Sequence, residues 1–193
     1  MKRIPSIVTV IAVSFLFVAT ASAATLIIAD FDSGDKPSNI KGDFGTWNRD
    51  EADATQGCKM NFNNDTTHNE KGFSIQLAYD VDSPNPAYNG LWMNLENKNV
   101  SQYDKLTFWV KGDGKTGFSP KIKIELKNSK GEAGKYTLTS ISKEWRQVSI
   151  PLKQFTGLAD LTSMRELVIV FDDITSETKK KGTIYIDDIA FVK

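Results

Sequence analysis

The sequence predicts an all-β protein, an antiparallel β-sandwich of the jelly-roll type. Three observations carry this prediction. Several short segments alternate large apolar and polar residues, turn-forming residues separate them at intervals of about eight to twelve residues, and only one short stretch has a helical pattern. About nine or ten strands in one domain are expected.

The first residues have the pattern of a secretory signal rather than of a folded element. Lys2 and Arg3 form a basic start, Ile7 to Val18 is almost wholly apolar, and Ala21 to Ala23 is a small-residue cleavage site. We therefore expect residues 1–23 to be removed and residues 24–193 to form a single exported domain, periplasmic or extracellular. No later apolar run reaches about twenty residues, so no membrane span is expected in the mature chain.

The charge balance argues against a nucleic-acid partner. The chain has 24 basic and 24 acidic residues, so losing Lys2 and Arg3 leaves 22 against 24, a formal charge of −2. Nothing in it supplies the basic surface that phosphate contacts need. Cys58 is the only cysteine, which excludes an intramolecular disulfide. It is either a buried apolar position or a reactive thiol, and the usual burial of cysteine favours the first.

Period-two alternation identifies the strands in order, each with one buried face. The pattern is weak where Cys58 to Phe62 is expected to form a strand, and Phe44 to Trp47 is expected to close a loop onto the sandwich. Phe155 to Met164 is the only plausible helical turn. The remaining expected strands are Thr25–Ala29, Phe73–Tyr79, Gly90–Leu95, Tyr103–Lys111, Lys121–Lys127, Lys135–Thr139, Trp145–Leu152, Val168–Phe171 and Gly182–Lys193.

The last of these segments carries two adjacent carboxylates, Asp187 and Asp188, in an otherwise apolar run. A buried charge is costly unless it is paired, hydrogen-bonded or bound to a cation. A second acidic group, Asp30 and Asp32, follows the first expected strand. If the first and last strands lie side by side, these four carboxylates meet, and oxygen ligands of this kind suit calcium. The alternative is that they are solvated turn residues.

Four segments, taken in order, resemble one family. They are Ala29 to Asp32, Leu106 to Gly114, Glu144 to Leu152 with Phe155, and Ile186 to Ile189. The sequence resembles the galactose-binding-like jelly rolls of family 11 carbohydrate-binding modules and the related complex I intermediate-associated protein domain. This resemblance implies a sandwich whose concave sheet holds a β-glucan chain, and a structural calcium. A fold of this kind hosts many functions.

A sugar-binding face needs aromatic side chains beside hydrogen-bonding groups. Trp92 and Trp109 lie on the parity opposite the core of their strands, and Trp47 and Tyr88 lie in expected loops. Trp109 could equally pack beneath a covering loop, and Trp145 is expected to be structural. The candidate carbohydrate-binding residues are Trp92, Trp109, Trp47, Tyr88, Lys123, Glu125, Gln76 and Asn94.

Catalysis has little support. Glycoside hydrolysis needs two carboxylates about 5–10 Å apart across the sugar. The acidic pairs here, Asp172 with Asp173 and Asp187 with Asp188, are neighbours along strands, so their side chains diverge to opposite faces. His68 is the only histidine, which makes zinc improbable and favours a solvated loop residue. The chain is therefore expected to be a non-catalytic carbohydrate-binding module for a β-glucan-like polysaccharide. The alternatives are a protein-interaction domain on the same fold, an accessory component of a cellulase-like system and, with least support, an enzyme acting on glycans.

Overall fold

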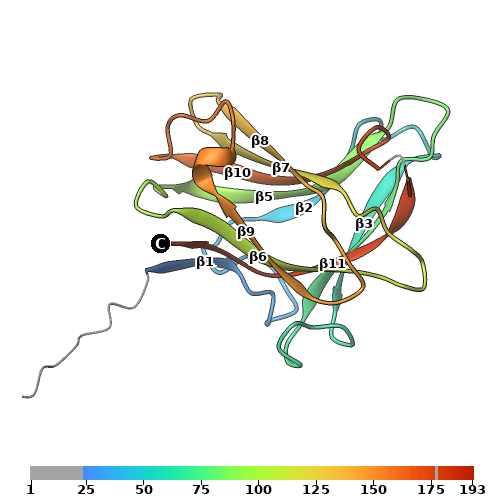
Figure 1. The fold of residues 1–193 in the computed structure, drawn as a ribbon, viewed down its shortest axis with the longest axis horizontal. Helices are drawn as coiled ribbons and strands as arrows, with labels where there is room; N and C mark the ends of the chain where they lie inside the picture. Colours follow the sequence, from blue (N-terminus) through green and yellow to red (C-terminus); the bar gives the residue numbers. More distant parts are fainter. Residues whose placement is uncertain (1–23, 177) are drawn as a thin grey trace, which may run out of the picture.

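The chain forms two packed antiparallel sheets (Figure 1). The computed structural model describes residues 24–176 and 178–193, so the expected export signal lies outside the described residues. Within those ranges there are eleven strands and one 3-10 turn, η1 (Leu152–Gln154), and no α-helix. The strands are β1 (Thr25–Ala29), β2 (Phe44–Asn48), β3 (Gly57–Asn63), β4 (Ser74–Asp80), β5 (Tyr88–Lys98), β6 (Lys105–Gly112), β7 (Ile122–Asn128), β8 (Ala133–Leu138), β9 (Arg146–Pro151), β10 (Met164–Asp172) and β11 (Lys181–Val192).

The strand order defines two faces that solvent can reach. We call β2-β5-β10-β7-β8 the groove sheet, and β3-β4-β11-β6-β9, to which β1 adds through β11, the second sheet. All strand pairs in both sheets are antiparallel. The predicted antiparallel sandwich is therefore confirmed. Among the described residues, no helix is long and apolar enough to cross a membrane.

The core lies between the sheets and is built from alternate residues of each strand. On β5, Leu91, Met93 and Leu95 are at most 1% exposed, as the period-two pattern predicts. Tyr79 of the second sheet stacks on Phe171 of the groove sheet, with ring centroids 4.1 Å apart and planes at 6°. This contact joins the two layers by apolar burial and ring stacking.

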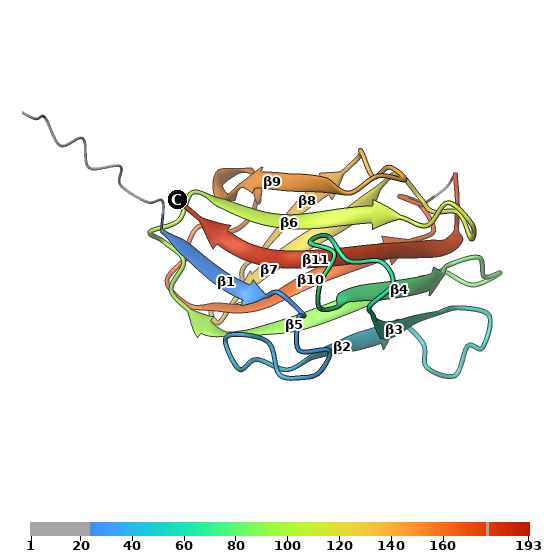
Figure 2. The ribbon, with the colours of Figure 1, turned by 90° about the horizontal axis from the view of Figure 1, so that it is seen from below.

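The predicted pairing of the two terminal strands is confirmed. β1 runs antiparallel to β11, with Leu26 opposite Phe191. In Figure 2, β1 and β11 lie side by side, and the loop between β3 and β4 crosses the face of β11. The acidic residues at the end of β1 and in β11 are therefore brought to one side of the second sheet.

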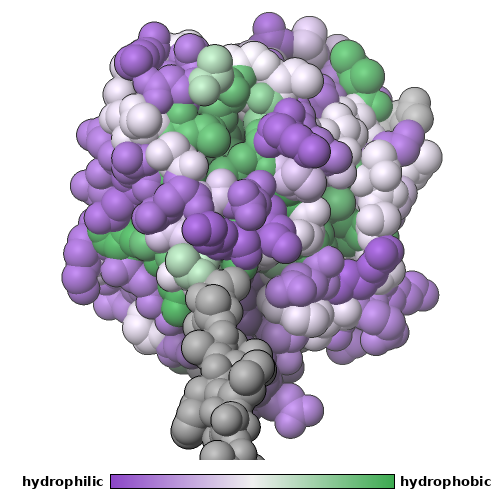
Figure 3. Space-filling model, turned by 60° about the vertical axis from the view of Figure 1, so that its left-hand side comes forward, coloured by the Kyte–Doolittle hydropathy of each residue, from purple (hydrophilic) through white to green (hydrophobic). Residues whose placement is uncertain are grey.

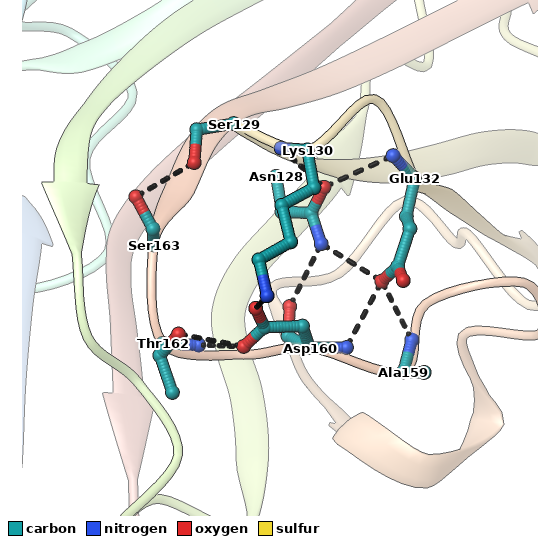
Figure 4. Close-up of polar contacts among 8 residues, drawn as sticks. All are labelled: Asn128, Ser129, Lys130, Glu132, Ala159, Asp160, Thr162 and Ser163. Carbon is teal, nitrogen blue, oxygen red and sulfur yellow. Dashed lines mark hydrogen bonds and ion pairs between the residues drawn. The ribbon is translucent and has the colours of Figure 1, made fainter.

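Two local expectations are corrected. Phe44–Asn48 is an edge strand, β2, rather than part of a loop, because it pairs with β5 in register. The segment 155–163 is not helical, and a side chain of the β7–β8 turn takes up two of its backbone N–H groups. Glu132 accepts hydrogen bonds from Ala159 N (3.0 Å) and Asp160 N (2.9 Å), as Figure 4 shows. We call the contacts that Asn128, Lys130 and Glu132 make with Ala159 and Asp160 the polar clamp.

The surface separates apolar and polar groups. On the face drawn in Figure 3, hydrophobic patches are bordered by hydrophilic side chains. Large hydrophobic residues exposed among the described residues are few: Ile27, Tyr88 and Ile174. The last two lie at one end of the groove sheet.

Candidate functional site

The outer face of the groove sheet forms an open groove of about 870 Å³. Every strand of that sheet contributes to its lining, and so do the segments that flank β5 and β10. The lining residues are Trp47, Pro86, Tyr88, Trp92, Lys123, Glu125, Lys127, Lys135, Thr137, Glu166, Val168, Val170, Asp172, Asp173 and Ile174. A groove of this size is within the range of sites that hold small organic ligands or parts of a polymer.

Strand register places the lining residues in rows across the sheet. Val168 of β10 pairs with Trp92 of β5 on one side and Glu125 of β7 on the other. Glu125 in turn pairs with Lys135 of β8. This row therefore runs from an aromatic side to a charged side.

The middle of the groove has an apolar floor. Val168 and Val170 point out of the core, because Leu167, Ile169 and Phe171 occupy the inner parity of β10. Both valines are nevertheless buried. The central position of β10 between longer side chains of β5 and β7 explains why this strand is apolar on both faces.

One wall of the groove is aromatic. The Trp92 indole lies over Gly45 of β2. A Cβ added at Gly45 would be 3.3 Å from the indole Nε1, so the glycine lets the indole lie close to β2. Further along, Trp47 and Tyr88 pack with ring centroids 5.7 Å apart and planes at 58°. The guanidinium of Arg49 lies 5.3 Å from the centroid of the Tyr88 ring. Trp47 and Tyr88 therefore hold each other in place at the end of the wall.

The opposite wall is a set of lysine–carboxylate pairs. Lys127 Nζ lies 2.7 Å from Glu166 Oε2. The remaining pairs are Lys123 with Asp172, at 3.0 Å, and Lys135 with Glu125, at 3.4 Å. The fixed side chains present donors and acceptors together while leaving little net charge, which suits a ligand rich in hydroxyl groups rather than one with a strong charge.

Asp172 is the most buried carboxylate of this wall, at 6% exposure. Burial opposes its ionisation, but the N–H of Thr175 and the ammonium of Lys123 outweigh it and hold the pKa of Asp172 below its ordinary value. Asp172 Oδ1 accepts hydrogen bonds from Thr175 N (2.8 Å) and Ile174 N (3.2 Å). The carboxylate therefore stays ionised near neutral pH and orders the segment that carries Ile174.

The polar clamp supports the far end of the groove. Asn128, which follows Lys127, is 1% exposed and donates hydrogen bonds to Glu132 Oε2 (2.8 Å) and Asp160 O (3.0 Å). Asp160 Oδ2 lies 2.6 Å from Lys130 Nζ (Figure 4). The clamp ties the β7–β8 turn to the segment before β10 and so fixes the ends of β7, β8 and β10, the three strands that carry the charged wall.

The structure brings five of the eight predicted binding residues into the groove: Trp47, Tyr88, Trp92, Lys123 and Glu125. Asn94 shares the outer parity of β5 with Trp92 but lies outside the lining. Its Oδ1 accepts a hydrogen bond from Glu96 N at 2.8 Å, which stabilises the backbone near the end of β5.

Gln76 and Trp109 do not join the other predicted residues, because β4 and β6 belong to the second sheet. Gln76 Nε2 donates to the hydroxyl of Tyr185 at 3.2 Å on that sheet. The Trp109 ring stacks on His68, with centroids 3.5 Å apart and planes at 19°. Trp109 therefore packs beneath a covering loop, the alternative that the sequence left open.

His68 is likewise not a solvated loop residue. Its backbone N–H donates to Asp187 Oδ2 at 3.0 Å, and its Nδ1 lies 2.9 Å from Asp188 Oδ2. The ring also packs edge-on to Trp145, at 6.2 Å. His68 thus anchors the β3–β4 loop over β11, a role with no signal in the local sequence because its partners lie about 120 residues away.

The four candidate calcium ligands lie in one region. A bulge separates the two neighbours in β11: Asp187 is 3% exposed, while Asp188 has a φ of 50°. Burial raises the pKa of Asp187 to about 6, and the charges of Asp188 and Asp32 add to this rise. Burial, together with Asp30 and Asp188, also raises the pKa of Asp32. These carboxylates therefore repel one another, the electrostatic condition that a bound cation would relieve.

The arrangement of this acidic region is only partly suited to a metal ion. Asp188 Oδ2 already accepts from His68 and Asn69, and Asp30 Oδ2 accepts from Asn39. Across the residues that the structure describes, no group of three or more histidine, cysteine or acidic side chains has an arrangement that could hold a metal. The donor chemistry fits calcium, whereas the side-chain positions do not form a complete ligand set.

Several groove residues had not been singled out from the sequence: Pro86, Lys127, Lys135, Thr137, Glu166, Val168, Val170, Asp172, Asp173 and Ile174. For Lys127 a signal was available, since it shares the charged face of its strand with Lys123 and Glu125. For the residues of β10, only the register with β5 and β7 reveals their position.

Solved structures with a similar fold include carbohydrate-binding modules. The family 11 module of a cellulosomal cellulase of Clostridium thermocellum is 16% identical, with a TM-score of 0.63, covering 89% of this chain and 96% of that one. A family 11 module of the same organism, in complex with a β-1,3-1,4-mixed-linked tetrasaccharide, is 17% identical, with a TM-score of 0.64 and coverage of 90% and 97%. The likeness in fold that the sequence motifs implied is confirmed.

A third similar structure is part of a larger enzyme. An exo-β-agarase matches with 14% identity and a TM-score of 0.63 over 86% of this chain but only 25% of the agarase. A comparison with curated proteins gave no match. The model of the family described as carbohydrate binding domain 30 matches residues 37–193, which include all of the groove sheet. The chain belongs to this family of carbohydrate-binding modules.

Proposed function

We propose that the groove binds a neutral, β-glucan-like polysaccharide and that the module itself is not catalytic. The observation that carries this proposal is the row that places Trp92, Val168 and Glu125 side by side across three strands. A sugar ring has apolar C–H faces and hydroxyls at its rim, so an aromatic wall, an apolar floor and a polar wall match it. The mixed-linked tetrasaccharide held by a structurally similar module supports a β-glucan as the ligand class.

Three of the four carboxylates that line the groove support a binding role over hydrolysis. Glu125, Glu166 and Asp172 each lie within 3.4 Å of a lysine ammonium. A hydrolase of the usual kind needs one protonated and one free carboxyl group facing each other across the sugar. Carboxylates already engaged by lysines are suited to accepting hydrogen bonds from hydroxyls.

Affinity gel electrophoresis of residues 24–193 across mixed-linked β-glucan, xylan, mannan and chitin derivatives tests this function. We expect retardation on β-glucan that is lost in Trp92→Ala and kept in Trp145→Ala, which removes a tryptophan outside the groove. Retardation on no polymer, in protein shown to be folded by circular dichroism, would contradict the proposal and favour a protein partner. Release of reducing sugar from a retained polymer would contradict the non-catalytic role.

We further propose that the protein is exported, with residues 1–23 as its signal. Support comes from the basic start, the apolar run and the small-residue site in the sequence. An exported module could act as an accessory component of a cellulase-like system, beside the enzymes that degrade the same polymer. Expression of the full chain with a C-terminal tag should yield a mature protein that begins at Ala24, as read by N-terminal sequencing.

We also propose that calcium binds between the end of β1 and β11, with Asp32, Asp187 and Asp188 as ligands and Asp30 beside them. The support is the buried Asp187 carboxylate, which has no lysine or arginine partner among the described residues. Calcium would have to displace the contacts that His68 and Asn69 make with Asp188. The melting temperature should rise on adding calcium to chelator-treated protein, and this rise should vanish in Asp32→Asn. An equal response to magnesium, or none to calcium, would contradict the assignment.

A further inference from the structure

A second hollow, of about 540 Å³, lies on the second sheet, where residues 54–57 before and at the start of β3 come close to residues 179–183 at the start of β11. Its lining is separate from that of the groove, because no residue is common to the two. The lining residues are Ala54, Thr55, Gln56, Gly57, Lys59, Ala78, Tyr79, Asp80, Thr116, Lys179, Lys181, Gly182 and Thr183.

Strand register explains why this part of the second sheet is hollow. Lys59 of β3 pairs with Ala78 of β4, which pairs with Thr183 of β11. In the next row Gly57 pairs with Asp80, which pairs with Lys181. Small side chains therefore form the floor, and the long side chains of lysines stand around it.

The hollow has an excess of positive charge. Among the described residues of the lining, Asp80 is the only acidic one, and Lys181 Nζ lies 2.7 Å from its Oδ2. In the ion pairs found among residues 24–176 and 178–193, Lys59 and Lys179 have no acidic partner. Both are exposed and so can move toward a ligand. Two unpaired ammonium groups at one hollow favour an anion.

The remaining lining groups indicate what kind of anion. Thr55 and Thr116 add hydroxyl groups to the wall, and their oxygens can accept hydrogen bonds. Gln56 supports this wall from behind: its Nε2 donates to Asp53 Oδ2 at 2.9 Å, and its Oε1 is buried. A hydroxyl-bearing ligand with one carboxylate matches this mixture, whereas a fully ionised inorganic anion offers no donor.

We propose that this hollow is a second carbohydrate site and that it takes an acidic sugar, the uronic-acid unit of a polysaccharide. Lys59 and Lys179 bind the carboxylate, and the wall of Thr55 and Thr116 faces the hydroxyls. The site lies on the opposite sheet from the groove, so one module can engage a neutral chain and an acidic chain at once. The proposal does not depend on what the groove binds.

Isothermal titration of residues 24–193 with a galacturonic-acid oligosaccharide tests the site. We expect binding that weakens about tenfold in the double variant Lys59→Gln, Lys179→Gln and persists in Trp92→Ala, with Lys153→Gln as a matched control at an exposed lysine elsewhere. Raising the salt concentration from 50 to about 500 mM should weaken binding, since these charges are exposed.

Three outcomes would overturn the proposal. The first is no binding of the oligosaccharide by folded protein. The second is binding that survives the double lysine variant but is lost in Trp92→Ala, which would place the acidic sugar in the groove. The third is equally tight binding of inorganic phosphate or sulfate, which would reduce the hollow to a site for simple ions.

Discussion

Trp92 and Glu125 lie at the same level of the groove sheet, separated only by Val168, which pairs with both. The two residues are 33 positions apart in sequence and sit on strands that do not pair with each other. A ligand bound across β10 therefore meets an indole face and a carboxylate in the same row. This relationship gives the groove its two unlike walls.

Replacing Trp92 by alanine should weaken binding of mixed-linked β-glucan by about 30-fold, because an aromatic anchor of a binding site contributes about 2 kcal/mol or more. Isothermal titration with a soluble oligosaccharide measures the change. Trp145→Ala is the matched control and should bind like the wild type. Equal losses in both variants would show that the effect is one of folding rather than of ligand contact.

Asp172→Asn should lower the free energy of unfolding by about 1 kcal/mol near neutral pH, because it removes the negative charge that pairs with Lys123. The asparagine keeps a side-chain oxygen that can accept from the Thr175 and Ile174 N–H groups. The native state holds the pKa of Asp172 below its ordinary value of 3.8. Its stabilisation is therefore complete above that value and is lost as the pH falls below it.

Urea unfolding at several pH values measures this dependence. The difference between the wild type and Asp172→Asn should be constant from about pH 8 to 5 and shrink below about pH 4. A difference that grows as the pH falls would contradict the assigned ionisation.

Asn128→Ala should lower the free energy of unfolding by about 2–3 kcal/mol, because the buried amide makes hydrogen bonds in four directions within the polar clamp (Figure 4). Ser129→Ala removes a single exposed bond to Ser163 and should cost less than about 1 kcal/mol. Denaturant titration of both variants separates the two cases. Similar small losses would mean that the clamp does not hold the β7–β8 turn.

Cys58 should react very slowly with iodoacetamide in the native protein at pH 8. Burial raises the pKa of its thiol to about 12, so the reactive thiolate is scarce as well as inaccessible. In denaturant the same thiol should react at the rate of an unfolded peptide. Mass spectrometry of the alkylated protein follows both reactions, and rapid labelling of folded protein would contradict the expected burial.

The fold was largely predictable because alternation is a local property. The core parity of Leu91, Met93 and Leu95 follows from the sequence of one strand, and the pairing of β1 with β11 follows from the acidic residues at both ends. Local alternation assigns a residue to one face of its own strand. It does not assign the strand to a sheet.

The candidate site was predictable only in part for this reason. Trp92 and Trp109 have the same local pattern, yet one lies in the groove and the other beneath a loop on the second sheet. Which sheet a strand joins depends on pairings between distant segments, as does the register that brings Asp172 to Lys123. The bulge at Asp188 likewise departs from ideal alternation and was not visible in the sequence.

The most direct test of the groove is a titration of 15N-labelled protein with a mixed-linked β-glucan oligosaccharide, followed through the indole N–H signals of its four tryptophans. Trp47 and Trp92 line the groove, whereas Trp109 and Trp145 pack around His68 away from it. We expect the signals of Trp47 and Trp92 to shift on binding and those of Trp109 and Trp145 to stay in place. Shifts confined to Trp109 and Trp145, or none at saturating ligand, would contradict the groove as the glucan-binding site.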